Sequence, residues 1–138
     1  TIVIGKHICQ VQQTFTKLFN LPQVAIDGSQ FGRLVDDGER FSLGEFCFTA
    51  IHTPGHTPAC MSYHIDNYLF VGDTLFMPDY GSARCDFPGG SASTLFDSVQ
   101  RLYQYDDSTQ MMLCHDYKAP GRDEFVWRTT VAHLCRQA

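Results

Sequence analysis

The chain has 138 residues and a formal net charge of −5, from 10 Lys and Arg against 15 Asp and Glu. Hydrophobic residues make up 43% and charged residues 18%, which is typical of one globular domain and excludes a disordered chain. The acidic balance argues against nucleic-acid binding, and no apolar run approaches the roughly 18 residues that a membrane-spanning helix needs. We therefore expect a single domain over residues 1–138 with no nucleic-acid or membrane partner.

The first predicted elements are a short strand and an amphipathic helix. Residues 1–4 are rich in β-branched side chains and predict the strand. From Ile8 onward, apolar residues at positions 8, 11, 15, 18 and 19 share one helical face. The helix should end at Leu21-Pro22, because a residue that precedes proline is disfavoured in the α conformation.

A β meander is predicted next, over residues 40–72. Residues 40–43 and 45–51 alternate between polar and apolar side chains around Gly44, as paired strands do. Residues 59–65 and 68–72 continue the pattern across the turn at Asp66-Asn67. Residues 73–91 show no periodicity, and a loop of this length inside a compact domain is usually functional.

The C-terminal part predicts two helices that flank a strand. Ser91 or Ser93 should cap a helix whose apolar residues at 95, 96, 99, 102 and 103 share one face. Residues 111–114 predict a short buried strand. A last helix is expected over residues 123–137, with Phe125, Trp127, Val131 and Leu134 directed into the core. The element order predicts an α/β or α+β fold with helices packed on a sheet.

The cysteines indicate a reducing compartment. Six cysteines occur without any Cys-x-x-Cys pair, which argues against a zinc ribbon or a thioredoxin-like motif. Cys47 and Cys60 lie in apolar, alternating stretches, where a thiol behaves as a small buried hydrophobe. We therefore expect reduced cysteines and a cytoplasmic protein.

Three segments place a side chain that can bind metal just beyond a predicted strand. They are His52-Thr53-Pro54-Gly55-His56-Thr57-Pro58, Gly72-Asp73-Thr74-Leu75 and Cys114-His115-Asp116-Tyr117. Taken alone, a histidine at a strand end is more often a surface or core residue, and Gly-Asp is more often a turn. Their occurrence together favours a metal site with His56, Asp73 and His115 as candidate ligands, because imidazole with carboxylate suits zinc, iron or manganese.

These three segments resemble the successive metal motifs of the metallo-β-lactamase superfamily, and the resemblance covers nearly the whole chain. Residues 81–90 (GSARCDFPGG) and 115–124 (HDYKAPGRDE) resemble the persulfide (sulfur) dioxygenases. Within that group they are closest to the bacterial "beta-lactamase-like hydrolase" branch associated with sulfide detoxification. The hydroxyacylglutathione hydrolases (glyoxalase II) are the nearest relatives with a different reaction.

The resemblance implies an αββα sandwich in which His56, Asp73 and His115 hold the metal. It also implies that Arg84 binds the substrate's carboxylate or persulfide, since a guanidinium offers a bidentate fork. Further residues receive weaker assignments. Tyr117 and Lys118 either contact a glutathione moiety or form a solvated loop, and His52 and Asp116 either support the ligands from behind or serve local packing.

One family motif is missing from the chain. In the family, a His-x-His-x-Asp-His segment should lie upstream of a stretch like residues 1–5; it is absent here, so we expect the domain to be incomplete at its N-terminus and also at its C-terminus. One ligand of a mononuclear site, or up to four of a dinuclear site, would then be lacking.

Three functions remain open from the sequence. The favoured one is a mononuclear Fe(II) dioxygenase acting on glutathione persulfide in sulfide detoxification, and the second is a glyoxalase II-like, dinuclear-metal thioester hydrolase, with one or two zinc ions as the alternative cofactor. The third is an inactive domain that serves as a folded remnant or an assembly unit. We expect such a domain to form a homodimer through an exposed sheet edge.

Overall fold

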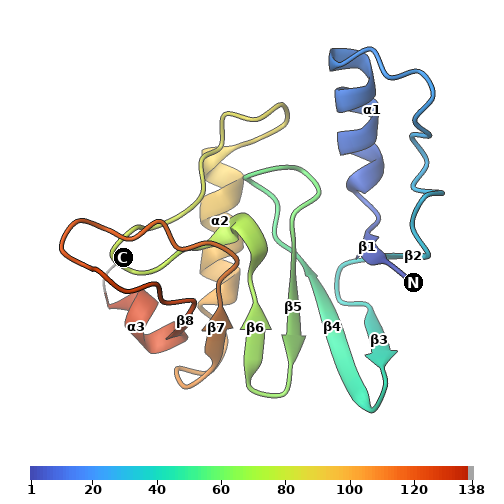
Figure 1. Cartoon of the computed structure of the whole chain (residues 1–138). Helices are drawn as coiled ribbons and strands as arrows, with labels where there is room; N and C mark the ends of the chain where they lie inside the picture. Colours follow the sequence, from blue (N-terminus) through green and yellow to red (C-terminus); the bar gives the residue numbers. More distant parts are fainter. Residues whose placement is uncertain (137–138) are drawn as a thin grey trace.

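The computed structural model describes residues 1–136 (Figure 1). Its helices are α1 (Ile8–Leu18), the 3₁₀ turn η1 (Gly72–Thr74), α2 (Ala92–Leu102) and α3 (Val131–Cys135). Its strands are β1 (Val3–Gly5), β2 (Arg33–Val35), β3 (Arg40–Leu43), β4 (Phe46–His52), β5 (Met61–Ile65), β6 (Tyr68–Phe70), β7 (Gln110–Met112) and β8 (Arg128–Thr130). The prediction of a domain over residues 1–138 thus includes two residues that lie outside the described part.

Within residues 1–136, six strands form the main sheet in the order β3-β4-β5-β6-β7-β8, and β1 and β2 form a separate parallel pair. The predicted meander is confirmed, because β3, β4, β5 and β6 pair successively in antiparallel fashion. The connection from β6 to β7 passes through α2, and the two strands therefore pair in parallel. The C-terminal ends of β6 and β7 consequently lie side by side.

The main hydrophobic core lies between one face of this sheet and the helices α2 and α3. The sheet contributes Ile51, Leu69 and Met111, and these pack with Leu102 of α2 and Val131 of α3. Figure 1 shows α2 running behind the central strands. Helix α2 begins at Ser91, whose hydroxyl accepts a hydrogen bond from the backbone N–H of Thr94 at 3.3 Å, so Ser91 rather than Ser93 is the N-cap.

The opposite face of the sheet is only partly covered. The β1–β2 pair packs against it beside Met61, so closely that a Cβ on Gly5 would lie 2.5 Å from the Met61 side chain. Elsewhere this face exposes aromatic side chains, and Tyr68 and Phe70 are each 43% exposed. The main sheet thus has helices on one face and the small β1–β2 sheet on the other. This arrangement agrees with the predicted αββα sandwich, of which the chain contains a part.

Three sequence-based expectations are wrong. Residues 123–127 lie outside any helix, and residues 128–130 form β8, which adds to β7 at the edge of the sheet. Phe125 and Trp127 are 62% and 63% exposed and therefore are not core residues. Cys47 is exposed, because it lies at the end of β4 that pairs with the edge strand β3, beyond the part of the sheet that the helices cover. The predicted end of the last helix, at residue 137, lies outside the described residues.

Among residues 1–136, no helix combines the length and the hydropathy that crossing a bilayer requires.

Candidate metal centre

The parallel pairing of β6 and β7 brings Asp73 and His115 together. Phe70 of β6 pairs with Met112 of β7, and each candidate ligand follows its paired residue by the same number of residues. As a result, Nε2 of His115 lies 3.2 Å from Oδ1 of Asp73. The two side chains are 50% and 37% exposed, so a ligand can reach them from solvent.

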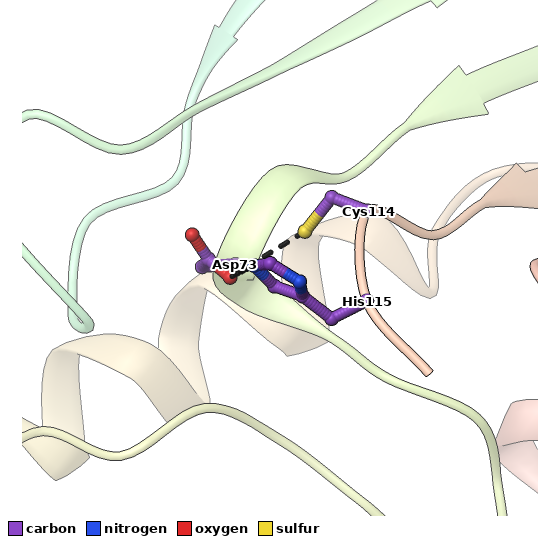
Figure 2. A group of neighbouring side chains, drawn as sticks. All are labelled: Asp73, Cys114 and His115. Carbon is purple, nitrogen blue, oxygen red and sulfur yellow. Dashed lines mark hydrogen bonds and ion pairs between the residues drawn. The ribbon is translucent and has the colours of Figure 1, made fainter. Parts of the chain in front are cut away.

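Cys114 completes a group of three donors. Its Sγ lies 3.4 Å from Asp73 Oδ1, and the donor atoms of Asp73, Cys114 and His115 all lie within 4.8 Å of one another (Figure 2). A carboxylate, a thiol and an imidazole at this spacing fit one divalent ion of the zinc or iron type. The sequence reasoning assigned no ligand role to Cys114, although its place next to His115 at a strand end was a usable signal.

The Cys114 thiol is protonated in the metal-free arrangement. Burial, together with the negative charge of Asp73, raises the pKa of Cys114 to about 12. The thiol therefore donates a hydrogen bond to Asp73. A metal that binds this group has to displace the thiol proton, which couples metal binding to proton release.

His56 lies on the loop that follows β4, outside this group of three. Its Nδ1 donates a hydrogen bond to the carbonyl oxygen of Arg84 at 2.7 Å, because a carbonyl can only accept. The lone pair of the neutral ring then resides on Nε2, which is the usual arrangement for a histidine that binds metal. The structure brings Asp73 and His115 together, whereas a ligand role for His56 stays a prediction.

The loop that carries His56 is fixed against α2. The hydroxyl of Ser98 donates to the carbonyl oxygen of Pro54 at 2.6 Å, and the N–H of Ser91 donates to that of Gly55 at 2.8 Å. Gly55 has a φ of +139°, and a Cβ at this position would lie 2.4 Å from Cα of Leu95. The close approach of loop and helix therefore requires glycine.

His52 closes the same loop instead of entering the group of three. Its Nε2 donates to the carbonyl oxygen of Pro58 at 2.8 Å, and its ring stacks on that of His7 with centroids 4.1 Å apart. Its backbone N–H donates to Asp37 Oδ1 at 2.8 Å. The predicted support of the metal ligands by His52 thus acts, at most, through the shape of the loop.

Asp116 organises the segment that follows His115. Its carboxylate accepts both terminal nitrogens of Arg122, one of them at 2.6 Å, and the backbone N–H groups of Lys118 and Val126 at 3.0 and 2.7 Å. The Arg122 guanidinium holds the pKa of Asp116 well below its usual range. Arg122 also pairs with Asp79 at 2.6 Å. The contacts of Arg122 with Asp116 and Asp79, which we call the clamp, therefore join the segment after His115 to the loop between η1 and α2.

The predicted substrate-binding residues lie at the surface around these loops. Tyr117 is 53% exposed and packs against Phe76, Tyr80 and His115, with ring centroids 5.0 to 5.6 Å away. Arg84 pairs with Asp86 and lies over the ring of Phe87 at 4.6 Å. Nζ of Lys118 lies 4.5 Å from the ring centre of Phe125. Roles for Arg84, Tyr117 and Lys118 in binding substrate stay predictions.

A family model described as the metallo-beta-lactamase superfamily matches residues 6–115. The chain belongs to this superfamily. The match includes the loop that carries His56 and all three residues of the Asp73, Cys114 and His115 group.

Curated relatives extend the comparison. The chain is 49% identical to a probable metallo-hydrolase of Burkholderia pseudomallei over an alignment of 147 positions. The alignment covers 99% of this chain and 50% of that protein. It is 47% identical to glyoxylase B2 of Dictyostelium discoideum over 131 residues, 94% of this chain and 44% of that protein. A hydroxyacylglutathione hydrolase of Erwinia tasmaniensis is 44% identical over 85 residues, 61% of this chain and 32% of that protein. The chain thus spans half or less of these relatives.

A solved structure shares the fold. The crystal structure of ETHE1 from Myxococcus xanthus superposes with a TM-score of 0.68 at 26% identity, covering 98% of this chain and 70% of that one. The fold is therefore the metallo-β-lactamase fold, of which this chain contains a part.

Proposed function

We propose that the protein is a metal-dependent hydrolase that cleaves a hydroxyacyl thioester of glutathione. The observation that carries the proposal is the cluster of Asp73, Cys114 and His115, whose donor atoms lie within 4.8 Å of one another at an accessible edge of the sheet. The names of the relatives, which include a metallo-hydrolase, a glyoxylase and a hydroxyacylglutathione hydrolase, support this choice.

The residues of this chain hold the metal and shape the surface around it. Asp73, Cys114 and His115 would bind zinc or iron, and a bound metal supplies a Lewis acid that polarises a carbonyl and lowers the pKa of water. His56 would offer Nε2, because a neutral ring that donates from Nδ1 to Arg84 has its lone pair on Nε2. Tyr117, next to His115, offers an aromatic surface to the substrate, and Lys118 offers a positive charge to a glutathione carboxylate.

A persulfide dioxygenase with one Fe(II) is the second candidate. It is favoured by the orientation of His56, whose neutral ring would present Nε2 to a metal, since two histidines and a carboxylate are the ligands typical of non-haem iron oxygenases. In this reaction, His56 and Asp73 would supply two of the three ligands, and His115 would lie nearby without an essential role. The two candidates therefore make different demands on His115.

The deciding experiment measures thioester hydrolysis and O₂ consumption on the same preparation. The purified protein is loaded with zinc or with Fe(II) and given a hydroxyacyl thioester of glutathione or glutathione persulfide. We expect thioester hydrolysis, reduced by a factor of about 10 to 100 or more in His115→Ala. His133→Ala is the matched control, because His133 lies on α3 and bonds to Thr129. Iron-dependent O₂ uptake without hydrolysis would refute the proposal and support the dioxygenase. Inactivity with both substrates would favour the third possibility, an inactive domain that serves as a folded remnant or an assembly unit.

A further inference from the structure

Three buried hydroxyl groups are joined by hydrogen bonds, and one of them belongs to Thr74, the residue after Asp73. Thr53, Ser62 and Thr74 have no exposed surface. The hydroxyl of Thr74 donates to that of Thr53 at 3.2 Å, and the hydroxyls of Thr53 and Ser62 are 3.0 Å apart. The Ser62 hydroxyl in turn donates to the backbone carbonyl oxygen of Val71 at 3.5 Å.

The direction of the hydrogen bonds follows from counting protons. Each hydroxyl has a single proton, and Ser62 uses its proton on the carbonyl of Val71. Thr53 must therefore donate to Ser62, and it accepts from Thr74. This series of hydrogen bonds starts at the Thr74 hydroxyl and ends at the Val71 carbonyl oxygen. Both ends therefore lie at the short turn that carries Asp73.

The middle of this chain belongs to the loop that carries His56. Thr53 directly follows His52, and its backbone N–H donates to the carbonyl oxygen of Cys60 at 2.9 Å. The hydroxyl chain thus connects the His56 loop, which follows β4, to the Asp73 turn, which follows β6. Ser62 lies on β5, the strand between them.

We propose that Thr53, Ser62 and Thr74 are positioning residues, whose hydroxyl chain fixes the Asp73 carboxylate relative to the His56 loop for metal binding. A buried hydroxyl that loses its hydrogen-bond partner lowers the stability of the fold. A series of hydroxyls that all have partners therefore favours one arrangement of the His56 loop and the Asp73 turn over all others. This inference rests on the proposed function only in requiring that a metal binds at Asp73. It does not depend on which reaction the metal serves.

The test compares variants of the full chain that differ in one hydroxyl or one methyl group. Thr53→Val keeps the shape and removes the hydroxyl, whereas Thr53→Ser keeps the hydroxyl and removes the methyl. Zinc affinity is measured by competition with a chelator, and the geometry of the site is followed by the visible absorption spectrum of bound Co(II). Thr129→Val is the matched control, because Thr129 is also buried and its hydroxyl bonds to His133, on α3.

We expect Thr53→Val to weaken zinc binding about 10-fold, the lower end of the range for direct partners of metal ligands, because Thr53 reaches Asp73 only through the turn, and to change the Co(II) spectrum. Thr53→Ser should bind zinc within a few-fold of the wild type. Thr129→Val should alter neither readout, even if it lowers stability. Ser62→Ala, a smaller change, should weaken binding in the same direction and keeps the test decisive if Thr53→Val does not fold.

Zinc affinities and Co(II) spectra that are unchanged in a folded Thr53→Val, or in Ser62→Ala, would overturn the inference. A wild-type protein that binds no metal would overturn both this inference and the proposed function. A wild-type protein that binds zinc without cleaving a thioester would overturn the proposed function alone, and the positioning role would then stand on the affinities.

Discussion

Replacing Gly55 by alanine tests how closely the His56 loop is packed on α2. The new Cβ would lie 2.4 to 2.5 Å from Cα, Cβ and the backbone nitrogen of Leu95, where no flexible side chain can move aside. The φ of +139° adds backbone strain of about 1–3 kcal/mol, and displacing close-packed atoms costs about 1–3 kcal/mol more. We expect Gly55→Ala to lower the free energy of unfolding by about 2–6 kcal/mol.

The assay is urea unfolding followed by circular dichroism, with zinc binding measured on the folded protein. Gly44→Ala is the matched control, because Gly44 also has a positive φ of +62° but meets no atom within 4 Å. It should cost only about 1 kcal/mol and should leave zinc binding unchanged. If Gly55→Ala were no more destabilising than Gly44→Ala, the argument from close packing would be refuted.

Four other predictions concern the helix cap, the metal, the clamp and the edge of the sheet. Ser91→Ala should lower the free energy of unfolding in urea by about 1 kcal/mol, and a Ser93→Ala variant that is equally unstable would contradict the cap assignment. Zinc at about 100 times its Kd should stabilise the wild type by about 2.7 kcal/mol in the same assay. Asp73→Asn should lose most of this gain, so equal gains would count against the metal site. Because Arg122 lowers the pKa of Asp116, the stability from this pair is present above the carboxyl's ordinary pKa of about 4 and is lost as the pH falls below it. The difference in unfolding free energy between wild type and Arg122→Gln should therefore shrink from about pH 5 to about pH 2, and a constant difference would exclude this linkage. A homodimer through the edge strand β3, which among the described strands pairs only with β4, should appear by light scattering. A monomer at all concentrations would argue against it.

Local patterns predicted the elements whose neighbours in the fold are also neighbours in sequence. The β3–β6 meander follows from alternation and turn residues, and α1 and α2 follow from the spacing of their apolar side chains. The prediction of the last helix was wrong. Residues 125, 127, 131 and 134 have nearly helical spacing, but the pairing of β8 with β7 overrides this local preference. That pairing joins segments that the long loop after His115 separates, which no local pattern reports.

The candidate site was only partly accessible to sequence reasoning. Asp73 and His115 were named as candidates because each follows an apolar strand, and the parallel pairing of β6 and β7 explains why they meet. Cys114 received no ligand role although it lies next to His115, and the direction of its thiol depends on how the chain bends beyond β7. The hydroxyl chain through Thr53, Ser62 and Thr74 joins three separate segments, and burial, not residue type, gives it its significance.

In the crossover between β6 and β7, the candidate metal ligands and the long loop before α2 are held in different ways. Asp73 and His115 are held by the register of two paired strands, whereas residues 76–91, between η1 and α2, form no regular helix or strand beyond one isolated bridge at Ser82. Changes in this loop that keep the contacts of Asp79 and Arg84 can therefore remodel the surface near Asp73 and His115 without shifting these two residues. In such an architecture, substrate range can diverge during evolution while the metal chemistry stays constant.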